Sequence, residues 1–189
     1  MLAAGRSRRL GSPKALVRVA GRPLVALQAR RALASGAAWV GVVASPALHA
    51  RLRTALRALP VAVIRSAGSH RGLSASIRAG VTAVPTGMRR ILLVEVDQWA
   101  VRAVDLGDLA RGVGRRPRAA QYFGRLGIPA VFPSHLRPAL CRLDGDRGAR
   151  DLLTRAEGRH LPRAELDLDT PADRAVLRRH PVLFNGLPP

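Results

Sequence analysis

The sequence predicts an α/β fold in three layers, α/β/α, with helices on both faces of a mostly parallel sheet. Short apolar runs rich in β-branched residues alternate with longer amphipathic stretches, which is typical of strands and helices that follow one another. Neither an internal repeat nor a long linker interrupts this alternation. We therefore expect residues 1–189 to form a single domain, long enough to bury a core.

The apolar runs place the strands, and the stretches between them place the helices. The expected strands are 39–44, 61–64, 91–96, 119–123 and 129–132. The expected helices are 22–35, 47–58, 73–83, 104–113, 146–156 and 171–180. Pro23 and Pro171 lie where the first turn of a helix tolerates proline. Residues 2–4 should end the first strand, but only Met1 precedes them, so this strand is expected to be unusually short or to continue upstream.

The chain is strongly basic, with 32 Lys and Arg residues against 12 Asp and Glu residues and a formal net charge of +20. Such a balance suits phosphate-bearing partners such as nucleotides or nucleic acid. The arginines are spread over the whole chain, however, and aromatic residues make up only 3%, so no basic stripe with interleaved aromatics forms. We attribute most of the charge to the codon bias of a GC-rich genome and expect no nucleic-acid partner.

Nothing in the sequence points to a membrane or to an oxidising compartment. The uncharged stretch 32–50 is long enough for a membrane helix, but Gly36, Pro46 and His49 interrupt it. The N-terminus lacks the apolar stretch of a signal peptide. A single cysteine, Cys141, rules out a disulfide or a zinc cluster within the chain and suits a small core residue. We expect a soluble, cytoplasmic protein without a membrane partner.

The N-terminal stretch LAAGRSRRLGSPKAL, residues 2–16, has the composition of a phosphate-binding loop. Gly5 and Gly11 allow backbone N–H groups to approach a phosphate closely. Three arginines add positive charge: Arg6, Arg8 and Arg9. Lys14 is the only lysine of the chain, and its flexible stem carries a point charge that a planar guanidinium does not replace. The stretch matches neither the Walker motif nor G-x-G-x-x-G, and a solvated arginine-rich turn is the alternative.

This stretch resembles the LAAGxSxRxGxPKxL signature of the MobA-like nucleotidyltransferases. Ala4 makes it similar to the molybdenum cofactor cytidylyltransferase branch, because the guanylyltransferase branch usually has glycine there. Further segments resemble the family's motifs in the family's order and extend over nearly the whole chain. They are GRPLVALQARRAL (21–33), GLSASIRAG (72–80), LLVEVDQWAV (92–101), YFGRLGIPAVF (122–132), GDRGARDLL (145–153) and LDLDTPAD (166–173).

The resemblance implies a Rossmann-like nucleotidyltransferase fold and a reaction that depends on Mg²⁺. A nucleotidyl group would pass from an NTP, here CTP, to a phosphorylated pterin-type acceptor such as molybdenum cofactor, and pyrophosphate would leave. A molybdoenzyme or its maturation chaperone would be a further partner. The alternatives are a nucleotidyltransferase of the same fold that uses GTP or another acceptor, and a non-catalytic relative that binds a nucleotide or a cofactor.

The resemblance also implies roles for individual residues. Those expected to act in catalysis are Lys14, Arg9 and Asp97. Those expected to bind the nucleotide are Leu2, Ala3, Ala4, Gly5, Ser7, Gly11, Lys14, Gly72 and Ser76. The metal ligands are expected to be Asp97, which follows an apolar strand at the edge where α/β sheets bind ligands, and Asp169. Acceptor contacts are expected from Gly127, Asp146 and Arg150.

Each of these assignments competes with a structural role. Asp97 is alternatively interpreted as a residue that caps the loop after its strand. Asp169 is alternatively interpreted as the N-cap of the helix that starts at Pro171. The neighbouring Asp167 is expected to be structural. Serines 74 and 76 are equally suited to capping the helix after Gly72. Residues 145–150 are equally suited to an internal Asp–Arg network.

Three residues depart from the family's pattern or add to it. Trp99 replaces the proline of an Asp-Gln-Pro motif, and we expect its bulk to wall the pocket or to change which acceptor fits. Ile128 replaces the histidine of a Gly-His-Pro motif, which removes a polar contact to the acceptor. Glu95 lies two residues before Asp97 on a strand and therefore on the same side, as a further active-site carboxylate or as the partner of an arginine.

Overall fold

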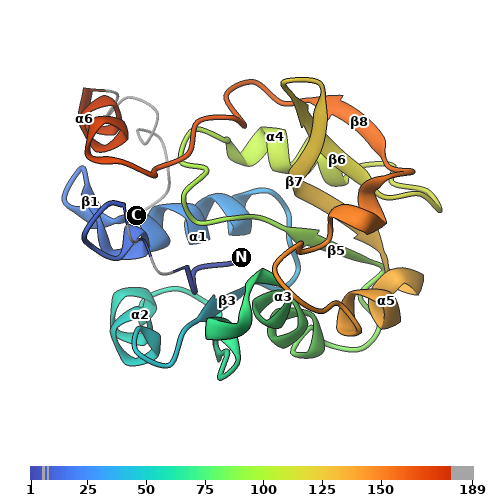
Figure 1. Ribbon diagram of the computed structural model, residues 1–189, viewed down its shortest axis with the longest axis horizontal. Helices are drawn as coiled ribbons and strands as arrows, with labels where there is room; N and C mark the ends of the chain where they lie inside the picture. The colour runs from blue at the N-terminus through green and yellow to red at the C-terminus, as the bar shows by residue number, and fades with distance from the viewer. Residues whose placement is uncertain (6, 8, 180–189) are drawn as a thin grey trace.

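The computed structural model describes residues 1–5, 7 and 9–179, and the predicted contributions of Arg6 and Arg8 lie outside the described residues. Its middle layer is a sheet made of two groups of strands (Figure 1). One group contains β3 (Gly41–Ala44) and β4 (Ala62–Arg65). The other has the order β5-β7-β6-β8, with β5 at Arg90–Leu93, β6 at Arg118–Tyr122, β7 at Arg125–Pro133 and β8 at Glu157–His160.

The N-terminal residues join these two groups. Leu2 forms parallel bridges to Val43 on one side and to Glu95 on the other. Its N–H donates to the carbonyl of Val94 (2.8 Å), and the N–H of Ala3 donates to the carbonyl of Val43 (2.9 Å). The buried amino group of Met1 donates to the Gly41 carbonyl (2.7 Å), and burial lowers the pKa of this amino group to about 5. The two bridges of Leu2 and the hydrogen bonds of Met1 and Ala3 therefore fix the position of the loop that follows them.

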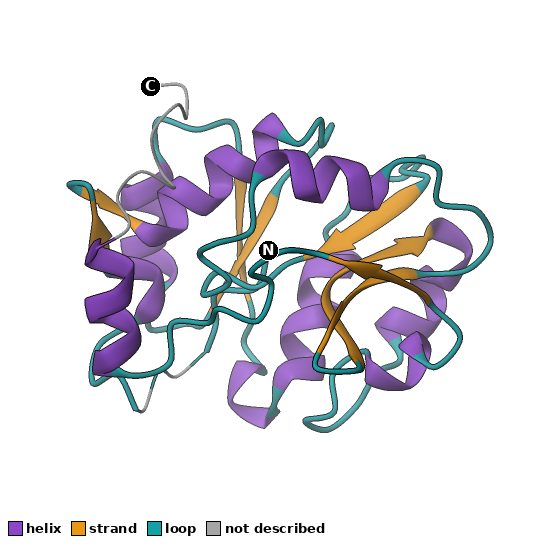
Figure 2. Ribbon diagram, turned by 90° about the horizontal axis from the view of Figure 1, so that it is seen from above, coloured by secondary structure: helices purple, strands orange, loops and turns teal. Residues whose placement is uncertain are grey.

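Helices cover both faces of the sheet (Figure 2). The first face packs against α1 (Leu24–Ala34), α2 (His49–Leu56) and α4 (Ala103–Ala110). The second face packs against α3 (Leu73–Thr82) and α5 (Arg137–Cys141). Successive strand residues alternate between two separate cores, as shown by Ala3 in the first and Leu2 in the second. The predicted three-layer α/β/α fold is confirmed.

The sheet is mostly parallel, as predicted. The pairs β3–β4 and β6–β8 are parallel, and so are both pairings of the N-terminal segment. The exception is β7, which runs antiparallel to β5 and to β6. No helix in the described part of the chain is long and apolar enough to cross a membrane.

Several elements differ from the sequence-based prediction. The expected helix 146–156 is wrong, because only a 3₁₀ turn, η4 (Arg150–Leu153), forms there. Gly145 and Gly148 have φ angles of +67° and +61°, which an α-helix does not accommodate. The expected helix 171–180 is observed as α6 (Pro171–Arg179), and position 180 lies outside the described residues. Helix α1 starts at Leu24 rather than at position 22, because β2 (Arg22–Pro23) pairs with β1 (Arg18–Val19).

Candidate functional site

A cavity of about 590 Å³ opens at the carboxyl ends of the parallel strands, beside the loop that follows the first strand. It brings together most of the residues predicted to act in nucleotide binding, catalysis, metal binding or acceptor binding. Those that line it are Leu2, Ala3, Ala4, Gly5, Ser7, Arg9, Lys14, Gly72, Ser76, Asp97, Asp146 and Asp169. Gly11 borders an adjoining hollow on the same loop instead. Gly127 and Arg150 line neither space.

Lys14 lies at the centre of the polar contacts in this cavity. Its main-chain N–H donates to Ser7 Oγ (3.0 Å), which ties Lys14 to Ser7 within the loop 5–14, called the arginine-rich loop below. Its ammonium donates to Asp97 Oδ2 (2.6 Å) and also hydrogen-bonds to Asp169 Oδ1. Burial alone would lower the pKa of Lys14, but the hydrogen bonds to Asp169 and Asp97 outweigh it and raise the pKa above its usual value. Lys14 is therefore a charged ammonium held between two carboxylates.

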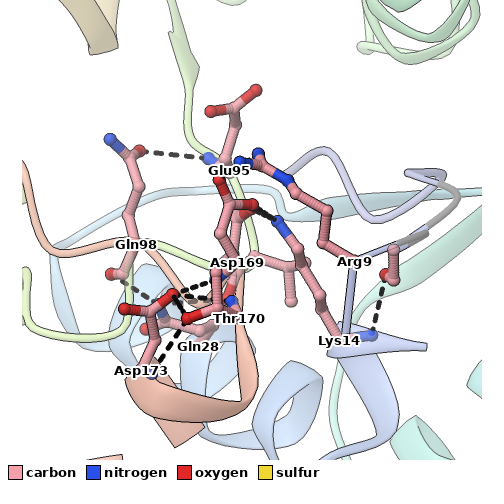
Figure 3. Close-up of polar contacts among 11 residues, drawn as sticks. Arg9, Lys14, Gln28, Glu95, Gln98, Asp169, Thr170 and Asp173 are labelled. Carbon is pink, nitrogen blue, oxygen red and sulfur yellow. Dashed lines mark hydrogen bonds and ion pairs between the residues drawn. The ribbon is translucent and has the colours of Figure 1, made fainter. Parts of the chain in front are cut away.

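A second cation reaches the same carboxylates from the solvent side. The Arg9 guanidinium donates to Asp169 Oδ2 (2.5 Å), and Figure 3 shows the side chains of Arg9 and Lys14 directed toward Asp169. The side chain of Arg9 is 70% exposed, whereas that of Lys14 is 15% exposed. Arg9 is therefore free to bind an incoming anion without losing a buried contact.

Main-chain contacts fix Asp97 beside Asp169. The carbonyl of Asp97 accepts hydrogen bonds from the N–H groups of Trp99 (2.8 Å) and Leu168 (3.1 Å), so the segment that carries Asp169 docks against the turn after Asp97. The buried amide of Gln98 donates to the carbonyl of Ile128 (2.5 Å). Gln98 thus braces the turn rather than facing the cavity.

The hydrogen bonds at the start of α6 exclude the interpretation of Asp169 as the helix cap. Thr170 Oγ1 accepts from the N–H of Asp173 (3.3 Å), and Asp173 Oδ2 accepts from the N–H of Thr170 (2.6 Å). These reciprocal bonds form a capping box. The Asp169 carboxylate is therefore available to the cations, while Asp167 is exposed and does not line the cavity.

The carboxylates of Asp97 and Asp169 fit the oxygen ligands that a divalent cation takes. Within residues 1–5, 7 and 9–179, no three His, Cys, Asp or Glu side chains gather into a complete metal site. Mg²⁺ commonly takes one or two carboxylates together with phosphate oxygens and water. Asp97 and Asp169 already share one cation, the Lys14 ammonium. The same two carboxylates therefore suit a metal ion whose remaining ligands are phosphate oxygens of the substrate.

Glu95 adds another carboxyl to the cavity wall, besides those of Asp97, Asp146 and Asp169. Burial, followed by repulsion from Asp97 and Asp167, raises the pKa of Glu95 to about 8. Among the described residues it forms no ion pair, so the prediction that it partners an arginine is not supported. Near neutral pH this carboxyl is largely protonated and neutral.

Glu95→Gln is expected to change how stability depends on pH. Glutamic acid titrates near pH 4.3 in an unfolded chain, so between about pH 4.5 and pH 8 the folded protein holds the extra proton. Stability is therefore lost as pH rises through this window, and glutamine removes the loss. We expect the variant to exceed the wild type by about 1–3 kcal/mol at pH 8.5 and to match it near pH 4.5, by urea unfolding with EDTA. An equal difference at both pH values would contradict the assignment.

The loop before α3 closes another side of the cavity. Gly72 has a φ angle of +121°, and a Cβ atom there would lie 2.7 Å from the carbonyl oxygen of Gly145, so only glycine fits. Asp146 Oδ1 accepts from the N–H of Leu73 (3.0 Å) and thereby caps α3. Ser74 Oγ donates to the carbonyl of Asp144 (3.0 Å). Asp146 and Ser74 thus hold two loops together, and Ser76 faces the cavity.

The prediction that Trp99 walls the pocket is wrong. Trp99 is 2% exposed and lies in a third apolar cluster behind the cavity. Its neighbours there include Leu10 of the arginine-rich loop, Leu168 next to Asp169, and Leu177 of α6. The indole therefore contributes to the apolar packing of the arginine-rich loop and of the segment that carries Asp169.

Gly127 and Arg150, two of the residues predicted to contact the acceptor, lie outside the cavity lining. A Cβ atom on Gly127 would lie 2.3 Å from Tyr122 Oη, so the glycine makes room for that side chain. Arg150 is exposed at the start of η4. The carbonyl of Ile128 accepts from Tyr122 Oη (3.2 Å), while its side chain packs against the second core.

Three polar residues that line the cavity were not predicted from the sequence: Ser69, His70 and Arg71, which form a 3₁₀ turn before Gly72. No spacing to another ligand or motif singled out His70. Their position follows only from the way the loop after β4 folds back over the strand ends.

Comparison with known proteins shows what this chain is similar to. The family model described as "MobA-like NTP transferase domain" matches residues 1–161. The chain is 34% identical over 139 residues to a protein of Opitutus terrae named probable molybdenum cofactor guanylyltransferase. The matched region covers 70% of this chain and 64% of that protein, which is less than two thirds of the relative's length.

Solved structures share the fold over nearly the whole chain. Rv0371c from Mycobacterium tuberculosis is 28% identical with a TM-score of 0.74, and the match covers 94% of this chain and 95% of that one. A complex of the same protein with manganese matches with a TM-score of 0.73 at 24% identity over 95% and 96% of the two chains. A nucleotidyl transferase from Methanothermobacter has a TM-score of 0.80 at 23% identity, over 97% and 96%.

Proposed function

Since this chain belongs to the MobA-like NTP transferase family, we propose that it transfers a nucleotidyl group from a nucleoside triphosphate to a phosphorylated acceptor. An acceptor phosphate oxygen forms a bond to the α-phosphorus, the bond from that phosphorus to the bridging oxygen breaks, and pyrophosphate leaves. The observation that carries the proposal is the convergence of Lys14 and Arg9 with Asp97 and Asp169 beside a glycine-containing loop. Cations and a carboxylate pair are the groups that phosphoryl chemistry requires.

The residues of this chain position and neutralise the triphosphate. A Cβ atom on Gly5 would meet nothing within 4 Å, so the backbone there is open to a phosphate oxygen. Lys14 supplies a mobile ammonium, and Arg9 supplies a guanidinium that can grip two oxygens. Asp97 and Asp169 would hold Mg²⁺, which neutralises phosphate charge when bound. The hydrogen bond from the buried Gln98 amide to the Ile128 carbonyl holds the turn after Asp97 in place. The capping box at the start of α6 does the same for the segment that carries Asp169, so the two carboxylates stay close to each other.

The nucleotide we propose is CTP. Ala4 is buried and lines the cavity, so its methyl group takes up space that a glycine would leave to a purine. GTP is the second candidate, because the curated relative is named a guanylyltransferase. The acceptor we propose is the phosphorylated pterin of molybdenum cofactor, which that relative's name also specifies. A molybdoenzyme or its chaperone would receive the product.

Pyrophosphate release from CTP and from GTP tests the proposal, with Mg²⁺ and molybdenum cofactor supplied. We expect release from CTP, and a loss of roughly 100-fold or more in Lys14→Ala, because the developing phosphate charge loses its ammonium.

Two other outcomes are informative. Release from GTP alone would keep the chemistry and reverse the choice of base, and Ala4→Gly should then leave the preference unchanged. Release from neither nucleotide would contradict nucleotidyl transfer to this acceptor.

A further inference from the structure

Lys14 occupies the point on which the two candidate metal ligands converge. Its ammonium contacts Asp97 Oδ2 at 2.6 Å and hydrogen-bonds to Asp169 Oδ1, while Arg9 binds the other oxygen of Asp169 at 2.5 Å. The contact of Lys14 with Asp97 is largely shielded from water, since these side chains are 15% and 18% exposed, whereas Asp169 is 35% exposed. The carboxylate pair is therefore already neutralised before any metal binds.

A divalent cation that joined this pair with Lys14 still in place would lie beside a positive charge. Like charges a few ångströms apart repel strongly where the surroundings are partly desolvated. The same ammonium is the group proposed to bind the triphosphate, and a lysine side chain is long and flexible enough to move from one partner to the other. A bound triphosphate is a more strongly charged partner for the ammonium than the carboxylates are. If the ammonium moves to the triphosphate, the two carboxylates are left free to bind the metal that accompanies it.

We propose that the Lys14 ammonium holds the divalent-metal position in the nucleotide-free protein and gives it up when a metal–nucleotide complex binds. This inference rests on the proposed function of the same site. It makes metal binding conditional on the nucleotide, so that each ligand raises the affinity for the other. It also gives a physical reason for a single lysine among 32 basic residues, because a planar guanidinium is poorly suited to exchanging between a carboxylate pair and a phosphate.

Mn²⁺ binding to the nucleotide-free protein tests the exchange without any turnover. Free Mn²⁺ is measured by electron paramagnetic resonance during titration of the wild type, Lys14→Met and Arg9→Met. Removing the ammonium leaves two facing carboxylates, so Lys14→Met is expected to bind Mn²⁺ roughly tenfold more tightly or better than the wild type. Arg9→Met is the matched control, since Arg9 also pairs with Asp169 but is exposed and does not touch Asp97. Its affinity should change by less than about threefold.

One further variant and one further measurement locate the effect. The double variant Lys14→Met/Asp97→Asn should lose the tighter binding, and Mn²⁺ should raise the melting temperature of Lys14→Met more than that of the wild type. If Lys14→Met does not fold, Lys14→Gln takes its place. Mn²⁺ affinity in the lysine variants that equals or falls below the wild-type value would overturn the exchange, even with normal pyrophosphate release. Tighter binding without pyrophosphate release would instead reject the proposed function and leave the exchange standing.

Discussion

Asp97→Asn is expected to lower pyrophosphate release by roughly 10²–10³-fold or more, with little change in fold stability. The asparagine amide is almost the same size, and the main-chain bonds that fix position 97, from Trp99 and Leu168, do not involve the side chain. What is lost is one of the two negative charges that face Lys14 and that would hold the metal. The measurement is steady-state release of pyrophosphate, together with a thermal melt of each protein.

Asp108→Asn serves as the control, because Asp108 is exposed on α4, pairs with Arg111 and lies outside the cavity. Its release rate should stay within about threefold of the wild-type rate. The pair of variants also separates an enzyme from a non-catalytic binder. An enzyme loses turnover in Asp97→Asn while still binding triphosphate, whereas a binder shows no turnover in the wild type and only weaker binding in the variant.

The sequence predicted the layers of the fold and most of the cavity because both depend on local patterns. Val42 and Val43 belong to an apolar run, and such a run can only be a buried strand in a chain that alternates with amphipathic helices. Asp97 follows another such run, so its place at the carboxyl edge follows from strand direction alone. The arginine-rich loop lies beside it because the first strand pairs with both neighbours.

The features that the sequence did not reveal depend on tertiary contacts. All four residues of β8 are exposed, so the strand has no apolar pattern and forms only because β6 offers a free edge. The choice between metal ligand and helix cap at Asp169 required the Thr170–Asp173 bonds. The role of Trp99 could not be inferred from its neighbours in sequence, because the indole packs against residues about 70 to 90 positions away, Leu10 and Leu168 among them.

Trp99→Ala is expected to destabilise the protein by about 3–5 kcal/mol, the usual cost of truncating a buried aromatic side chain. For a chain of 189 residues this corresponds to a fall in melting temperature on the order of 10 °C. Trp99→Phe should recover much of the loss, because it keeps most of the apolar volume. Chemical denaturation of the wild type and both variants measures the effect.

The same substitution should weaken nucleotide use as well as stability. Trp99 shares an apolar cluster with Leu10 of the arginine-rich loop and with Leu168 beside Asp169, so a cavity there is expected to loosen the loop and the position of Asp169. We expect the KM for the triphosphate to rise several-fold in Trp99→Ala at a temperature where the variant is fully folded. Trp39→Ala is the control, because Trp39 is only partly buried and packs over Gly41 at the opposite end of the strands. A KM that rises equally in both variants would show a general loss of rigidity instead of support for the loop.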